Sequence, residues 1–230
     1  MEIDHIFIRA RADAPEALAL ARLGLSEGSA NRHPGQGTAN RRFFFHNAFI
    51  ELLWLADAAE ARSAPTAPTG LWQRLGGAGP DGGGLDSACS PFGVCFRPAP
   101  GADPQPPFAS WPYRPAYLPS GLAVDIAAAP LAEPMWFFLG FGGRPDAAPP
   151  ERRQPLAHPN GWREITALRI TLAPGAADGD RVRSDTAAAA RAAGVELVEG
   201  DAHLLEIGFD HEVAGRLHDL RPALPLILRW

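Results

Sequence analysis

The sequence contains no lysine, only two cysteines and no excess of positive charge. All 21 basic residues are arginines, and the formal net charge is −5. Proteins that bind nucleic acids usually need a basic surface that displaces counterions from the phosphates, so this balance argues against DNA or RNA partners. Cys89 and Cys95 are too few for a disulfide framework and match no zinc-binding spacing. We expect both to be reduced and structural.

Long apolar runs are also absent. No stretch approaches the roughly 20 apolar residues that a transmembrane helix needs, so no membrane partner is expected. The first residues form a strand-like run rather than the basic and apolar segments of a secretory signal, which favours a cytoplasmic protein. A chain of 230 residues can bury a substantial core without cross-links. The sequence does not determine the oligomeric state, and a homodimer is compatible with it.

Two polar side chains occur inside apolar strand-like segments. His5 lies in Ile-Asp-His-Ile-Phe-Ile at residues 3–8, and Glu51 lies in Phe-Ile-Glu-Leu-Leu-Trp at residues 49–54. Side chains alternate between the faces of a strand, so each shares its face with apolar neighbours. Burial of a lone carboxylate costs several kcal/mol unless something compensates it. An ion, a proton or a partner is therefore implied at Glu51.

The same pattern recurs late in the chain. Residues 165–170 read like the first strand, with Ala167 in the place of His5, and residues 204–207 read like the fourth strand, with Glu206 in the place of Glu51. A repeat of this length favours two copies of one βαβββ unit.

The repeat predicts three regions of one compact domain. A first module at residues 1–60 and a second module at 163–230 are joined by a proline- and glycine-rich segment at 61–162 that adds strands. A second module that begins near Phe92 instead of near Ile165 is the alternative.

Local signals divide the first module into elements. A helix is expected over about residues 14–23, with a capping box formed by Asp13 and Glu16. The polar, glycine-rich residues 28–40 indicate a long loop, and the next two strands form a hairpin that turns near His46.

His5 and Glu51 suit a divalent metal, such as Zn, Ni, Mn or Fe, that keeps open positions for substrate and water. If the two units are true repeats, Glu206 is the third ligand, whereas Ala167 cannot be a fourth. In the alternative, Arg42 lies across the hairpin from Glu51, and a cross-strand ion pair satisfies the carboxylate without any metal.

The segment at residues 31–40 is the densest polar cluster in the sequence. Its glycines permit close approach of the backbone, and its side chains could orient an anionic or carbonyl-bearing ligand. A rigid turn that closes one end of the sheet would explain the same residues. The candidate substrate-binding residues are Arg32, His33, Thr38, Asn40 and, on the following strand, Arg42.

Residues 3–6, 33–40 and 49–53 resemble the vicinal oxygen chelate superfamily and, within it, the glyoxalase-like domain proteins. The resemblance implies an α+β fold in which paired βαβββ modules form a cupped mixed sheet, here with a Pro/Gly-rich insertion. It also implies a divalent metal held by ligands from both modules, which places His5 and Glu51 in the first module and Glu206 in the second.

Enzymes of this superfamily use the metal as a Lewis acid that binds two neighbouring substrate oxygens. The resemblance implies a glyoxalase-like protein that acts on a small oxygen-bearing metabolite as a metal-dependent lyase, isomerase or dioxygenase. Glu51 and Glu206 would be its catalytic residues, as ligand or general base. Ala167 departs from the ligand pattern, which argues against a standard glyoxalase I activity. The alternative is a metal-free protein of the same fold that binds or sequesters a small molecule.

Overall fold

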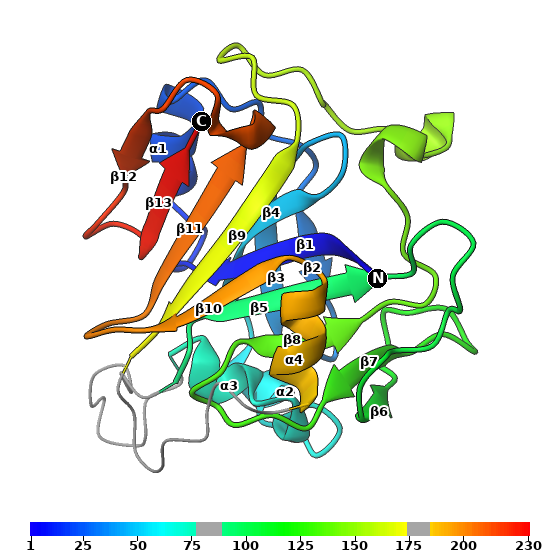
Figure 1. Cartoon of the computed structure of the whole chain (residues 1–230). Helices are drawn as coiled ribbons and strands as arrows, with labels where there is room; N and C mark the ends of the chain where they lie inside the picture. Colours follow the sequence, from blue (N-terminus) through cyan, green and yellow to red (C-terminus); the bar gives the residue numbers. More distant parts are fainter. Residues whose placement is uncertain (77–88, 174–184) are drawn as a thin grey trace.

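The computed structural model describes residues 1–76, 89–173 and 185–230 (Figure 1). It shows a mixed α+β protein with two curled sheets and short helices. Parts of the Pro/Gly-rich segment and of the late unit, residues 77–88 and 174–184, lie outside the described residues.

Among the described residues, the first sheet has eight strands in the order β2-β3-β4-β1-β5-β8-β7-β6. These strands are β1 (Glu2–Arg9), β2 (Asn31–His33), β3 (Thr38–Phe44), β4 (Phe49–Leu55), β5 (Phe92–Arg97), β6 (Ser110–Tyr113), β7 (Val124–Ala127) and β8 (Met135–Phe138). Helices α1 (Ala17–Arg22), α2 (Ala58–Ala61) and α3 (Leu71–Arg74) connect them, and single 3-10 turns occur at Ala67–Thr69, Pro145–Ala147 and Pro150–Arg152.

The two halves of this sheet have the same arrangement. β1 pairs in parallel with β4, β5 pairs in parallel with β8, and β1 and β5 meet as antiparallel neighbours at the centre. Strands β5–β8 therefore complete the cupped sheet that β1–β4 begin. This pairing favours the alternative in which the second module begins near Phe92.

The late unit forms a sheet of its own in the same described part of the chain. Its strands follow the order β10-β9-β11-β13-β12, and β9 pairs in parallel with β10 and antiparallel with β11. The expected order of strand, helix and strands is present, but the pairing differs from that of β1–β4. The elements are β9 (Ile165–Leu172), α4 (Asp185–Ala192), β10 (Val195–Glu199), β11 (Leu204–Phe209), a 3-10 turn at Asp210–Glu212, β12 (Leu217–Asp219) and β13 (Leu226–Arg229).

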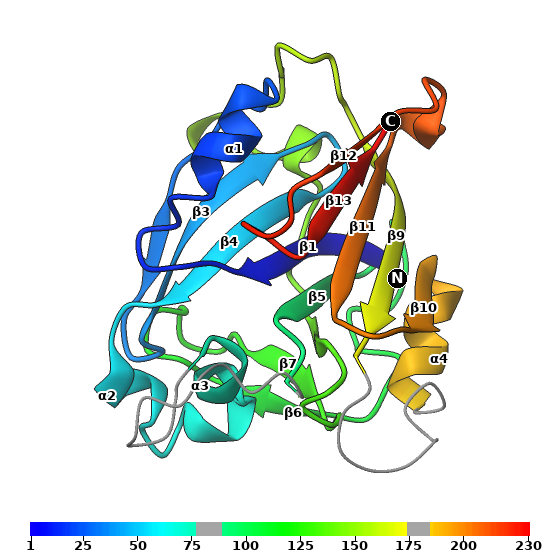
Figure 2. The same cartoon turned by 90° about the vertical axis from the view of Figure 1, so that its left-hand side faces the viewer.

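The second sheet covers one face of the first (Figure 2). Ile6, Ile50 and Phe96 of the first sheet share one buried cluster with Leu168 and Ile207 of the second. A smaller cluster lies on the other face of the first sheet, where the strands curl around it. The core between the sheets thus fixes one face and leaves the cupped face for a site.

Three local expectations have different outcomes. Helix α1 begins only at Ala17, and Glu16 makes no capping hydrogen bond, because its carboxylate accepts from the Arg11 side chain at 2.7 Å. The expected loop at 28–40 contains strand β2. The hairpin turn near His46 is confirmed, since β3 and β4 pair up to Phe44 and Phe49.

In the described part of the chain, no helix is both long and apolar enough for a membrane span.

Candidate functional site

The cupped face of the first sheet holds a cavity of ≈ 180 Å³. Strand β1 supplies His5, β4 supplies Glu51, and β3 supplies Asn40 and Arg42. The other side of the cavity is mostly apolar, with two tyrosines among its residues. The remaining lining residues are Phe7, His33, Gln36, Phe49, Leu53, Leu71, Tyr113, Tyr117, Leu118, Val124, Met135, Phe137, Leu139 and Phe141.

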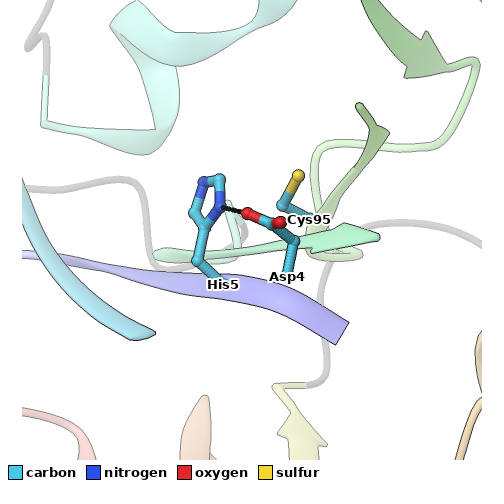
Figure 3. A group of neighbouring side chains, drawn as sticks. All are labelled: Asp4, His5 and Cys95. Carbon is cyan, nitrogen blue, oxygen red and sulfur yellow. Dashed lines mark hydrogen bonds and ion pairs between the residues drawn. The ribbon is translucent and has the colours of Figure 1, made fainter. Parts of the chain in front are cut away.

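His5 is oriented by its neighbour Asp4 (Figure 3). Adjacent strand residues normally point to opposite faces, but a bulge between Ile3 and His5 interrupts the register with β5 and lets the two side chains meet. The Asp4 Oδ1 atom lies 2.7 Å from His5 Nδ1. The imidazole also stacks on Phe49, with ring centroids 4.4 Å apart. Because a carboxylate accepts only, Nδ1 carries the proton, and Nε2 lies 3.6 Å from Glu51 Oε2.

Glu51 is buried, with a side-chain exposure of 7 %. Asn40 on the neighbouring strand donates to Glu51 Oε1 over 2.5 Å. The second oxygen faces His5. Glu51 is therefore a carboxylate held at one oxygen by an amide, with the other oxygen directed toward the imidazole.

Arg42 lies directly across the hairpin from Glu51, as the ion-pair alternative requires. Its guanidinium instead donates to the Ser29 carbonyl at 2.8 Å and hydroxyl at 2.9 Å, and it lies over the Phe44 ring. Burial lowers the pKa of Arg42, and the charge of Glu51 opposes that shift. The hydrogen bond that satisfies Glu51 thus comes from Asn40.

His33 enters the cavity at the end of β2 through a chain of hydrogen bonds. Thr38 Oγ1 lies 2.8 Å from His33 Nδ1 and accepts from Gln36 Nε2 at 2.8 Å, while the Tyr117 hydroxyl donates to Gln36 Oε1 at 3.2 Å. Burial lowers the pKa of His33, against the opposing charge of Glu51. Because its pKa is lowered, His33 is neutral near pH 7. Burial raises the pKa of Tyr117.

The predicted substrate-binding residues divide into three groups. His33, Asn40 and Arg42 line the cavity, and Thr38 positions His33. Arg32 is exposed and does not line the cavity.

Glu206 is not brought to the cavity. It lies on β11 in the second sheet, where its carboxylate accepts from Arg229 Nε at 2.7 Å and Nη2 at 2.5 Å, and it lines a separate hollow. The cause is topological, because the late unit forms its own sheet instead of the second half of the cupped one. The structure therefore brings His5 and Glu51 together and leaves Glu206 apart.

In the described part of the chain, three possible metal ligands gather beside the cavity, and two of them already have partners within the protein. Asp4, His5 and Cys95 offer ligand atoms within 4.8 Å of one another (Figure 3). However, the contact between Asp4 and His5 is a hydrogen bond, and Asp4 also faces Arg97 at 3.6 Å. Burial and the charges of Asp4 and Glu51 raise the pKa of Cys95, which disfavours the thiolate that metals bind.

Sequence reasoning missed Asp4, Gln36 and Tyr117. Strict alternation assigns Asp4 to the face opposite His5, and the bulge that reverses this has no clear sequence signal. Gln36 lies inside the polar segment at 31–40, so its position did mark it. Tyr117 comes from the Pro/Gly-rich segment, and only the fold brings it to Gln36.

The first part of the chain is similar to a known family. Residues 3–103 match the family model of the glyoxalase-like domain. No curated protein matches the sequence. Among solved structures, a hypothetical protein from Staphylococcus aureus aligns at 9% sequence identity with a TM-score of 0.49, over 99% of this chain and 98% of that chain.

Proposed function

We propose that the cavity is the active site of an enzyme that moves a proton on a small oxygen-bearing metabolite. The match of residues 3–103 to the glyoxalase-like domain supports this proposal. In this proposal, a lyase or isomerase reaction begins with loss of a proton beside a substrate carbonyl. One observation carries the proposal: His5 Nε2 and Glu51 Oε2 face each other at 3.6 Å on the cavity wall.

When His5 is neutral, the His5–Glu51 pair consists of two acceptors. The Nδ1 proton is then donated to Asp4, Nε2 presents a lone pair, and the Glu51 carboxylate accepts only. Two acceptors in an apolar setting attract a proton or a cation between them. A proton that either group can hold suits general acid–base catalysis, in which Glu51 removes a substrate proton and His5 takes part in its return.

Donors beside this pair could bind the substrate oxygens. Thr38 accepts from Gln36 and can donate its own proton to His33 Nδ1, which places the His33 proton on Nε2. A neutral imidazole N–H can stabilise the charge that develops on a carbonyl oxygen. Arg42 adds a guanidinium at the same side of the cavity.

The test is the exchange of α-protons with solvent. Hydroxyacetone and 2-hydroxyacetophenone, two neutral α-hydroxyketones, are incubated with the protein in D₂O and followed by proton NMR. Glu51→Gln should lower the protein-dependent exchange rate by about 10²-fold or more. Glu196→Gln, which removes an exposed carboxylate on the second sheet, is the matched control and should exchange at the wild-type rate. Equal rates in wild type and Glu51→Gln would refute the proposal.

A small-molecule binding or sequestration protein is the second candidate, favoured by the largely apolar wall of the cavity. It predicts that 2-hydroxyacetophenone binds without any exchange above the solvent rate. A third outcome assigns the His5–Glu51 pair to a metal. Calorimetric titration of tag-free protein with Zn²⁺, Ni²⁺ or Mn²⁺ would then show stoichiometric uptake in the wild type that is lost in Glu51→Gln and kept in Glu196→Gln.

A further inference from the structure

The two halves of the cavity differ in chemistry although they share one backbone arrangement. The half built by β1–β4 carries the charged and amide side chains, and the half built by β5–β8 lines the cavity with apolar and aromatic side chains, two tyrosines included. We infer that the ligand carries an apolar group of about the size of a phenyl ring, directly beside its oxygen functions. This inference names the substrate class of the proposed active site and rests on that proposal.

The register of the central strands relates the two halves. His5 lies opposite Cys95, and Phe7 lies opposite Gly93, in the antiparallel pair of β1 and β5. A twofold axis between these two pairs exchanges His5 with Gly93 and Phe7 with Cys95. The residue equivalent to the imidazole of the acid–base pair is therefore a glycine.

The flanking strands extend this relation to the carboxylate. Glu51 of β4 is the partner of Phe7, and Phe137 of β8 is the partner of Cys95. Since the axis exchanges Phe7 with Cys95, it also exchanges Glu51 with Phe137. The second half thus replaces both members of the acid–base pair, one by a glycine and the other by an aromatic ring.

Packing shows what occupies the position that matches the His5 side chain. A Cβ atom added at Gly93 would lie 2.0 Å from a carbon of the Phe7 ring, so this ring occupies the space that matches the His5 side chain. The Phe137 ring stands edge-on to His5, with centroids 5.3 Å apart. An aromatic wall therefore directly adjoins the acid–base pair.

The rest of the second half continues this wall. Its further apolar lining residues are Leu118, Val124, Met135, Leu139 and Phe141, and the hydroxyls of its two tyrosines, Tyr113 and Tyr117, are hydrogen-bonded to Thr66 and Gln36. The cavity of ≈ 180 Å³ is small. Phe137 lines it beside His5 and Glu51, so a ligand whose oxygens bind at these polar groups has an aromatic surface directly next to it.

Equilibrium binding of a matched pair of probes tests this inference. Hydroxyacetone and 2-hydroxyacetophenone carry the same vicinal oxygens and differ by a methyl and a phenyl group. NMR titration of the whole chain should show that 2-hydroxyacetophenone binds roughly tenfold to hundredfold more tightly, as expected for burial of a phenyl-sized surface. Equal affinities, or binding of neither probe, would overturn the inference.

Variants on the apolar wall provide the second arm. Phe137→Gln should bring the affinity ratio of the two probes close to one. Phe141→Ser, at a residue 46% exposed, should lower the ratio without risk to folding, and Leu18→Ser, at a residue 55% exposed outside the cavity, is the control that keeps it. An unchanged ratio in folded Phe141→Ser and Phe137→Gln would also overturn the inference.

The affinity measurements and the α-proton exchange measurements test the two proposals separately, so one proposal can fail while the other stands. Phenyl-selective binding together with unchanged α-proton exchange in Glu51→Gln would refute the proton-transfer proposal and leave the ligand class standing. Glu51-dependent exchange without any preference between the two probes would do the reverse.

Discussion

At the scale of single residues, the Asp4 carboxylate controls the orientation of His5. Its hydrogen bond to Nδ1 directs Nε2 toward Glu51. Removal of a residue that orients a functional histidine through its second ring nitrogen typically lowers activity by about 10- to 100-fold. Asp4→Asn should therefore lower α-proton exchange of 2-hydroxyacetophenone by that factor while the protein stays folded, because Arg97 keeps its contacts with Glu2 and the Ile3 carbonyl. Wild-type exchange in folded Asp4→Asn would contradict this role.

Glu206 gives a residue-scale prediction in the opposite direction. Its partner Arg229 is partly exposed, so the ion pair is screened and contributes only about 0–1 kcal/mol. Glu206→Gln should shift the free energy of unfolding within that range in urea titrations and should leave the binding of 2-hydroxyacetophenone unchanged. Loss of that binding would return Glu206 to the site that the repeat predicted.

These residues show which parts of the candidate site can be predicted from the sequence. His5 and Glu51 could be predicted because polar side chains stand out in strands of period two. Asp4 could not, because the bulge that turns it toward His5 forms only when β1 pairs with β5. The repeat predicts Glu206 in the site only if two units with the same order of elements also share their strand pairing, and tertiary contacts decide that pairing.

At the scale of elements, His158 anchors the chain segment that connects the first sheet to the second. The Ser26 amide donates to His158 Nδ1 at 2.9 Å, and His158 Nε2 lies 2.9 Å from the Phe44 carbonyl. One ring nitrogen accepts while the other donates, which requires a neutral imidazole. This geometry fastens residues 157–160 to the end of β3.

The neutral state of His158 predicts a pH dependence of stability. Burial lowers its pKa below the ordinary 6.5, and the bond to Phe44 partly opposes the shift. At and below about pH 6.5 the unfolded chain therefore binds more protons than the folded protein does. The free energy of unfolding should fall as the pH drops below that value. His158→Ala should cost about 2 kcal/mol or more and flatten the slope between pH 7.5 and 5.5, as measured by urea unfolding. A slope equal to that of the wild type would exclude His158 as its source.

The turn before β3 depends on Gly37. Its φ is 76°, and an added Cβ atom would lie 2.2 Å from the Asp57 carbonyl oxygen at the start of α2. Gly37→Ala should therefore destabilise the fold by more than about 1 kcal/mol, through both strain and the clash with the backbone. Thermal unfolding measures the loss, and Gly121→Ala, also at positive φ but with open space around it, is the control for strain alone. Equal losses in the two variants would remove the role assigned to the Asp57 contact.

At the scale of the whole molecule, the two sheets share one core. Ile6, Ile50 and Phe96 are fully buried, and their cluster includes residues of β9 and β11. The turn after β3 adds polar contacts, since Asn47 donates to the Ile165 carbonyl and accepts from its amide. The cupped sheet thus depends on the late unit for its outer face.

This dependence predicts the behaviour of a truncated chain. A fragment of residues 1–162 would expose the face that carries Ile6, Ile50 and Phe96, and it should fail to fold because that burial is lost. A two-dimensional ¹H–¹⁵N NMR spectrum of the fragment should show the narrow dispersion of an unfolded or aggregated chain. Well-dispersed signals would mean that the cupped sheet is independent of the late unit.

The central claim is that Asp4 fixes the His5 tautomer so that Nε2 shares a proton with Glu51. Long-range ¹H–¹⁵N NMR of the histidine side chains tests it directly, because each ring nitrogen gives its own signal. We expect a protonated Nδ1 in His5, and an Nε2 signal that shifts in Glu51→Gln but not in Glu196→Gln. An Nε2 signal that is identical in both variants, or a His5 proton on Nε2 without one on Nδ1, would contradict the account.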